Sequence, residues 1–144
     1  MTKEQMHEAF QKLCDYLSLK GVKVEVASDG ENAFFPLTNT IRVNSKQNFN
    51  SRYYTLLHEI GHYLLRQEND FSEKYLEDVT RHSANKENRI DVLREEIVAW
   101  EKCLEFAEKN NFFVDKTQWK KYSKKYIYQY ALWTVNPRYF QIDE

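Results

Sequence analysis

The stretch His58-Glu59-Ile60-Gly61-His62 lies within a largely apolar run from Tyr53 to Arg66. Two histidines four residues apart on a helix point the same way, because four steps of about 100° nearly close a turn. Both imidazoles can therefore reach one metal ion. Glu59 would lie to the side of that ion, where a carboxylate can polarise a water molecule without acting as a ligand. The alternative is a histidine pair on the surface of an ordinary helix.

The residues around this stretch predict that its helix runs through the core. Apolar side chains occupy most of its sides, at Leu56, Leu57, Ile60, Leu64 and Leu65. Gly61 is a poor helix former and costs up to about 1 kcal/mol relative to alanine. Its position beside His62 indicates the close approach of another backbone or of a ligand. Asn50 or Ser51 is expected to cap the start of the helix.

A catalytic zinc site needs a third protein ligand, which must come from elsewhere in the chain. The candidates are His82 and two adjacent glutamates, Glu95 and Glu96. Apolar spacing predicts a second helix with one apolar face, formed by Ile90, Leu93, Ile97, Trp100, Cys103, Leu104 and Ala107.

On that helix Glu96 lies within the apolar face, about 40° from Trp100, and Glu95 lies about 140° away, toward solvent. A buried carboxylate needs a positive partner, and a divalent cation would be one. We therefore expect Glu96 to be the third ligand. A buried salt bridge between Glu96 and Arg66 or Arg89 is the alternative. His82, in a very polar segment, is expected to be a solvated loop residue.

With these residues the chain resembles gluzincin-type zinc peptidases, and more narrowly the ImmA/IrrE-like metallopeptidases common in phages and mobile elements. In that family a strand precedes the H-E-x-x-H helix, and a later helix supplies a glutamate through an E-x-x-A-N-like pattern, here Glu96 to Trp100. The resemblance covers residues 22–107. It implies zinc ligands at His58, His62 and Glu96 and a general base at Glu59. At Trp100 the family usually has a small polar residue.

The predicted fold class is α+β: a small zincin-like domain, mostly helical, with a short antiparallel sheet packed beside the helix that carries the H-E-x-x-H motif. Strands are expected at residues 22–26, 33–35 and 40–44. In zincins an edge strand just before the metal helix binds the substrate in extended form. Residues 40–44 occupy that place, so we expect the cleft to be lined by Ile41, Arg42, Val43 and Asn44. A plain scaffold strand is the equally weighted alternative.

Composition and charge describe one domain, residues 1–144, with 42% hydrophobic residues and a net charge of −1. No apolar signal region and no membrane span is visible, so we expect a cytoplasmic protein. Cys14 and Cys103 lack paired metal spacing and are expected to be reduced, partly buried thiols. Nothing in the sequence indicates the oligomeric state.

The two ends of the chain are expected to be helical. Thr2 and Gln5 form a capping box for a first helix, which Gly21 ends. Residues 115–134 form a final helix that is both aromatic and basic. Its aromatic side chains repeat at helical spacing, so core packing with lysines facing water explains them better than binding of nucleic acid does. One side chain near this end of the chain, or His82, would stabilise an oxyanion. The choice stays open among Tyr122, Tyr126, Tyr130, Arg138 and Tyr139. Residues 67–91 resemble a polar loop, for which a lid is one role.

The function expected from these observations is that of a zinc-dependent endopeptidase. The Zn²⁺ ion would activate water, Glu59 would act as general base, and the substrate would be a peptide bond in a protein, such as a regulatory protein. The alternative is a phage or mobile-element regulator that binds a host protein or nucleic acid, with zinc structural or absent.

Overall fold

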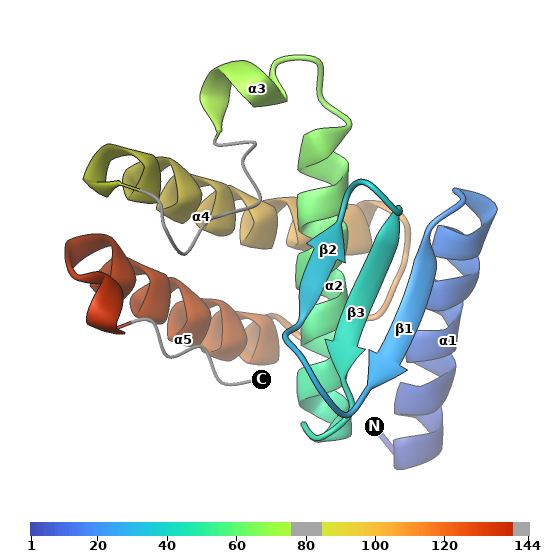
Figure 1. Ribbon diagram of the computed structural model, residues 1–144. Coiled ribbons are helices and arrows are strands. Elements are labelled where there is room, and N and C mark those ends of the chain that lie inside the picture. Colours follow the sequence, from blue (N-terminus) through green and yellow to red (C-terminus); the bar gives the residue numbers. More distant parts are fainter. Residues whose placement is uncertain (76–84, 140–144) are drawn as a thin grey trace.

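The computed structural model describes residues 1–75 and 85–139 and shows an α+β fold, as predicted (Figure 1). In chain order the elements are α1 (Lys3–Leu19), β1 (Lys23–Ala27), β2 (Ala33–Phe35), β3 (Thr40–Asn44), α2 (Phe49–Arg66), α3 (Phe71–Lys74), α4 (Lys86–Lys109), α5 (Lys116–Val135) and the 3-10 turn η2 (Pro137–Tyr139). Helices dominate and the strands are short, which agrees with the predicted class.

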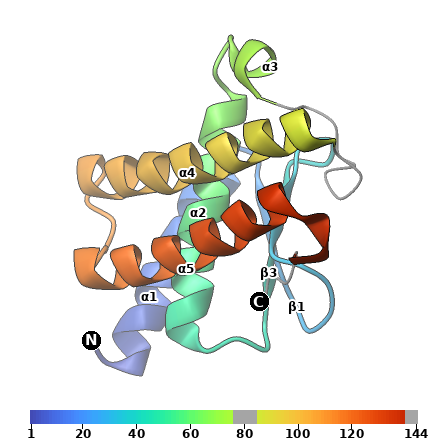
Figure 2. The ribbon, with the colours of Figure 1, turned by 90° about the vertical axis from the view of Figure 1, so that its left-hand side faces the viewer.

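Helix α2, which carries the two histidines, is the central element of the fold. It contacts α1, the strands β2 and β3, and the helices α4 and α5. Every residue from Tyr53 to Tyr63 is buried. Helices α4 and α5 lie side by side across it, while the sheet and α1 cover its other sides (Figure 2). The prediction that this helix runs through the core is confirmed.

The sheet has the strand order β1-β3-β2 and is mixed. β2 pairs with β3 in antiparallel orientation, as predicted, but β1 pairs with β3 in parallel orientation. The prediction of an antiparallel sheet was therefore wrong for β1. The chain leaves β1, forms β2 on the far side, and returns between the two strands as β3. Asn32, just before β2, ties this part of the chain to the end of β3. Its Oδ1 accepts hydrogen bonds from the Asn44 backbone N–H at 2.7 Å and from Gln47 Nε2 at 3.0 Å.

The helix ends follow local sequence signals. Thr2 and Gln5 form the predicted capping box of α1, and Gly21 follows this helix with a φ of +78°. The side chain of Asn48, not that of Asn50 or Ser51, caps α2 by accepting a hydrogen bond from the Ser51 N–H. Asn48 lies two positions before Asn50 and three before Ser51. It can cap the helix because a capping residue must lie just outside the first helical turn.

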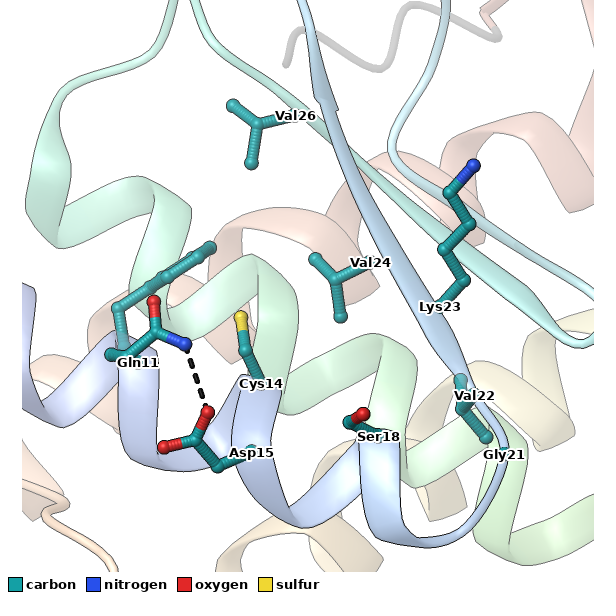
Figure 3. Close-up of a pocket in the computed structure, with 10 residues that line it drawn as sticks. Gln11, Cys14, Asp15, Ser18, Gly21, Val22, Lys23, Val24 and Val26 are labelled. Atoms are coloured by element: carbon teal, nitrogen blue, oxygen red, sulfur yellow. Dashed lines mark hydrogen bonds between the residues drawn. The ribbon is translucent and has the colours of Figure 1, made fainter.

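A groove runs between α1 and β1 and is lined by Gln11, Cys14 and Asp15 from the helix and by valines of the strand (Figure 3). Gln11 donates a hydrogen bond to Asp15 across one helical turn at 2.9 Å. Burial, followed by the negative charge of Asp15, raises the pKa of the Cys14 thiol to about 11. Cys14 and the buried Cys103 are both free thiols, as expected. The groove contains none of the residues predicted to bind metal.

No helix in the described parts of the chain is both long and apolar enough to cross a membrane.

Candidate metal centre

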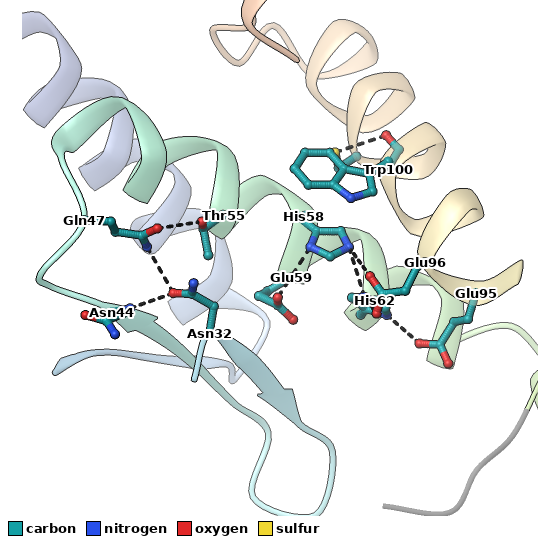
Figure 4. Close-up of polar contacts among 11 residues, drawn as sticks. Asn32, Asn44, Gln47, Thr55, His58, Glu59, His62, Glu95, Glu96 and Trp100 are labelled. Atoms are coloured by element: carbon teal, nitrogen blue, oxygen red, sulfur yellow. Dashed lines mark hydrogen bonds and ion pairs between the residues drawn. The ribbon is translucent and has the colours of Figure 1, made fainter. Parts of the chain in front are cut away.

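Three side chains from two helices converge at the centre of the molecule (Figure 4). His58 and His62 come from α2, and Glu96 comes from α4. The Nε2 atoms of the two histidines are 3.1 Å apart. Glu96 bridges them, with Oε2 2.8 Å from His58 Nε2 and Oε1 3.1 Å from His62 Nε2. The structure therefore brings together the three residues that the sequence predicted as ligands.

The glycine inside the motif allows α4 to approach α2 this closely. A methyl group at Gly61 would lie 2.1 Å from the carbonyl oxygen of Ala99 and 2.8 Å from its carbonyl carbon. Ala99 stands three residues after Glu96 on α4. The predicted close approach of another backbone at Gly61 is confirmed, and the contact determines how far the Glu96 carboxylate lies from the histidines.

Glu59 lies beside the cluster and outside it. Its Oε2 is 3.6 Å from His58 Nδ1, the ring nitrogen that faces away from Glu96. The side chain is buried, with 7% of its surface exposed. Figure 4 shows Glu59 on one side of the His58 ring and Glu96 on the other. This is the position expected for a carboxylate that acts next to a metal ion without binding it.

Helix α4 contributes a second buried carboxylate, whose predicted position was wrong. Glu95 was expected to point to solvent, but its side chain is fully buried and its Oε2 lies 2.5 Å from His62 Nδ1. The buried face of α4 also includes Val92, Ala99 and Phe106, whereas Ile97 and Ile90 of the predicted face are 37% and 47% exposed. The apolar pattern misplaced this face, because the carboxylates buried in it add no apolar signal.

The two carboxylates require a positive charge between them. Burial lowers the pKa of His62, but the charges of Glu96 and Glu95 outweigh burial and raise this pKa to about 10. Burial raises the pKa of Glu96, but His62 and His58 hold it well below its ordinary value. A proton on His62 thus supplies the positive charge in the absence of a cation. A divalent cation is the partner that this set of buried acids and imidazoles fits.

The hydrogen bond from His62 to Glu95 also has a consequence for metal binding. When Nδ1 carries the proton that is shared with Glu95, Nε2 presents its lone pair to the centre of the cluster. Metal-binding histidines commonly use a carboxylate in this way, which fixes the ring and makes it more basic. A short Glu-Glu pair on the second helix was the only sequence signal for this role, and helical period alone assigned just one of the two to the core.

His58 is held differently, by an aromatic ring. The indole of Trp100 stacks on its imidazole, with the ring centroids 4.3 Å apart and an angle of 6° between the planes. Tyr126 of α5 also stacks on the indole, with the ring centroids 6.0 Å apart and an angle of 20° between the planes. Trp100 is therefore part of the centre, although the sequence predicted it on the apolar face of the second helix and at the last position of the family-like pattern, with no role at the site.

The strand that was predicted to line the cleft is not an edge strand. β3 lies between β1 and β2 and pairs with both, so its main-chain groups are already used. Ile41 and Val43 are fully buried, Asn44 is nearly so, and Arg42 forms an ion pair with Glu25 at 3.7 Å. The prediction that residues 41–44 offer an edge to an extended peptide was wrong. Strand order depends on tertiary contacts that local alternation does not encode.

Helix α5 packs its aromatic side chains inward, as predicted. Tyr122, Tyr126 and Trp133 are buried. The lysines of the helix are exposed, at positions 116, 120, 121, 124 and 125. This arrangement agrees with core packing. Of the candidates for oxyanion stabilisation, Arg138 and Tyr139 are exposed, and the Tyr122 hydroxyl lies 3.3 Å from Ser51 at the start of α2. Residues 76–84, which include His82 and part of the segment for which a lid was one role, fall outside the described residues.

Comparison with protein families gives a match to the M78 peptidase family, described as the IrrE N-terminal-like domain, over residues 3–104. The match includes α1, the sheet, α2 and the part of α4 that carries Glu95, Glu96 and Trp100. Comparisons with curated proteins and with solved structures gave no match. Because the matched region covers more than half of the chain, this protein belongs to the IrrE N-terminal-like family of M78 peptidases.

Proposed function

We propose that this protein is a zinc-dependent endopeptidase that hydrolyses a peptide bond in a protein substrate. One observation carries the proposal: the convergence of His58, His62 and Glu96 from two helices, with their ligand atoms within 4.8 Å of one another. Membership of a peptidase family supports the same reaction class.

The donor atoms suit zinc in type and in spacing. Two imidazole nitrogens and one carboxylate oxygen are a common ligand set for catalytic zinc, and at bond lengths near 2.0–2.1 Å tetrahedral ligands lie about 3.3 Å apart. The contacts between donor atoms here measure 2.8 and 3.1 Å. The side chains would therefore need to separate by only a few tenths of an ångström.

The carboxylate of Glu59 is the proposed general base. It would accept a proton from the attacking water and then deliver it to the amine that leaves. A zinc ion held by His58, His62 and Glu96 would lower the pKa of water toward about 7 and polarise the scissile carbonyl. Burial of Glu59 keeps competing water away from this proton transfer.

The proposed substrate is an extended segment of a protein, such as a regulatory protein. β2 is an edge strand of the sheet and packs against α2; among the described residues no strand pairs with its outer side, which would offer main-chain groups to a peptide. We expect the protein to act in the cytoplasm, where Cys14 and Cys103 stay reduced. We do not expect it to bind nucleic acid, because the net charge is close to zero.

The first experiment is to measure metal content and anomalous scattering at the zinc edge, on protein purified without added metal. One zinc per chain, held by His58, His62 and Glu96 with one coordination position open, is the expected result. No zinc uptake after the metal is supplied would refute the proposal. A zinc with no open position would favour the alternative, a regulatory protein in which zinc stabilises the fold.

The second experiment tests the reaction itself. Zinc-loaded protein is incubated with a proteome-derived peptide library, and new termini are identified by mass spectrometry. Glu59→Gln should keep zinc and abolish cleavage, because an amide cannot accept the proton. The matched control is Glu101→Gln on the exposed side of α4, which should cleave normally. Retained cleavage by Glu59→Gln would remove Glu59 from its proposed role.

A further inference from the structure

The indole N–H of Trp100 is buried and has no hydrogen-bond partner among the described residues. A buried polar group without a partner is costly, and native structures contain few of them. The chain pairs the indole of Trp119 in the ordinary way: its Nε1 donates to the carbonyl oxygen of Trp100 at 3.0 Å. Few buried side-chain polar atoms in the described residues lack a partner, and Arg42 Nε is another such donor. The Trp100 N–H differs from it in lying beside the His58 ring, and it needs a physical explanation.

The position of this donor suggests what its partner is. The indole lies parallel to the imidazole of His58, and Figure 4 shows its nitrogen over the edge of that ring that carries Nε2. This is the edge that faces Glu96 and His62. Tyr126 also stacks on the indole, which limits the freedom of the ring to turn. The N–H is thus held at the cluster where the reacting groups of a substrate would lie.

We propose that the Trp100 indole N–H is a catalytic hydrogen-bond donor to the carbonyl oxygen of the scissile peptide bond. This inference rests on the peptidase function proposed above. Negative charge develops on that oxygen as water attacks the carbonyl carbon, so a donor fixed beforehand stabilises the transition state more than the ground state. An indole donates and does not accept hydrogen bonds, so it does not compete with Glu59 for the proton.

The matched pair of variants is Trp100→Phe and Trp119→Phe. Phenylalanine keeps an aromatic ring against His58 and removes only the N–H and part of the ring. Trp100→Phe should take up zinc with unchanged affinity, because it removes no ligand. Trp119→Phe removes an indole whose hydrogen bond is satisfied, so it should lower the thermal midpoint without affecting the centre.

The probe is acetohydroxamate, a small zinc ligand whose oxygens mimic a charged carbonyl oxygen, added to zinc-loaded protein labelled with ¹⁵N at tryptophan. The indole N–H resonance of Trp100 should move downfield on addition, and those of Trp119 and Trp133 should not. Trp100→Phe should bind the probe ~5- to 10-fold more weakly, the loss expected for one hydrogen bond. Trp119→Phe should bind it normally.

Two results would overturn the inference. One is an unmoved Trp100 resonance together with unchanged probe affinity in Trp100→Phe. The other is loss of zinc from Trp100→Phe, which would make the indole a support for His58 and not a donor to substrate. Failure of the wild-type protein to bind zinc would instead refute the proposed function. With a cleavable peptide in hand, Trp100→Phe should lower kcat about 100-fold with little change in KM.

Discussion

Replacement of Gly61 by alanine tests how the two helices that carry the centre are held together. The new methyl group would lie 2.1 Å from the Ala99 carbonyl oxygen, where real contacts are essentially never below 3.0 Å. The helices must therefore separate locally by about 0.9 Å, the difference between these two distances. The opposing group is backbone, so it cannot swing aside as a flexible side chain would.

The expected loss of stability follows from two opposing effects. Alanine gains about 1 kcal/mol of helix propensity over glycine. Overpacking of a buried contact costs about 1–3 kcal/mol. The group that meets the new methyl is rigid backbone, so the cost here should lie near the top of that range. The net decrease in the free energy of unfolding is therefore about 2 kcal/mol. For a chain of this length that corresponds to a thermal midpoint lower by about 8 °C.

The same substitution should weaken zinc binding. Glu96 lies three residues before Ala99 on α4, so it moves with the displaced helix. Metal–ligand distances tolerate only about 0.2 Å of error. We expect a loss of zinc affinity at least as large as that for removing an outer-shell partner, ~10- to 100-fold.

Differential scanning calorimetry and competition with a zinc chelator measure the two effects. Glu101→Ala, an exposed change on α4, is the control and should alter neither. Ala99→Gly should not rescue Gly61→Ala, because the clash involves the backbone of residue 99. A Gly61→Ala protein with wild-type midpoint and zinc affinity would show that the helices do not approach each other in this way.

Three further predictions concern the centre and the core. The sequence alone predicted that Glu95→Ala would be nearly neutral. The structure predicts that it weakens zinc binding ~10- to 100-fold in chelator competition, because His62 loses its hydrogen-bond partner. Unchanged affinity would contradict this. In metal-free protein the pKa of His62 is about 10, above the ordinary value of 6.5. The charged His62 therefore stabilises the fold fully below about pH 6.5, and this stabilisation is lost as the pH rises through about 10. Urea midpoints measured in EDTA should fall over that range. Constant midpoints would argue against this assignment. Leu13→Ala, at a fully buried site on α1, should cost about 2–5 kcal/mol in urea denaturation and leave the zinc stoichiometry unchanged.

Local rules determined the part of the centre that lies on one helix. The spacing of His58 and His62 sets their common direction through the helical period, which does not depend on the rest of the fold. Gly61 predicted a close backbone approach for a similarly local reason, because a missing side chain in a buried helix leaves room for another chain. The capping box at Thr2 was readable because it involves residues three positions apart.

Tertiary structure decided the features that depend on which surfaces meet. Strand alternation predicted three strands but not that β3 would lie between β1 and β2, because alternation defines faces and not neighbours. Helical period placed Glu96 in the core and Glu95 in solvent, yet both are buried, since α4 packs against α2 and α5 at once. The stacking of Trp100 on His58 likewise joins two helices. Spacing along each helix thus named the candidate ligands, and the packing between elements determined the residues that surround them.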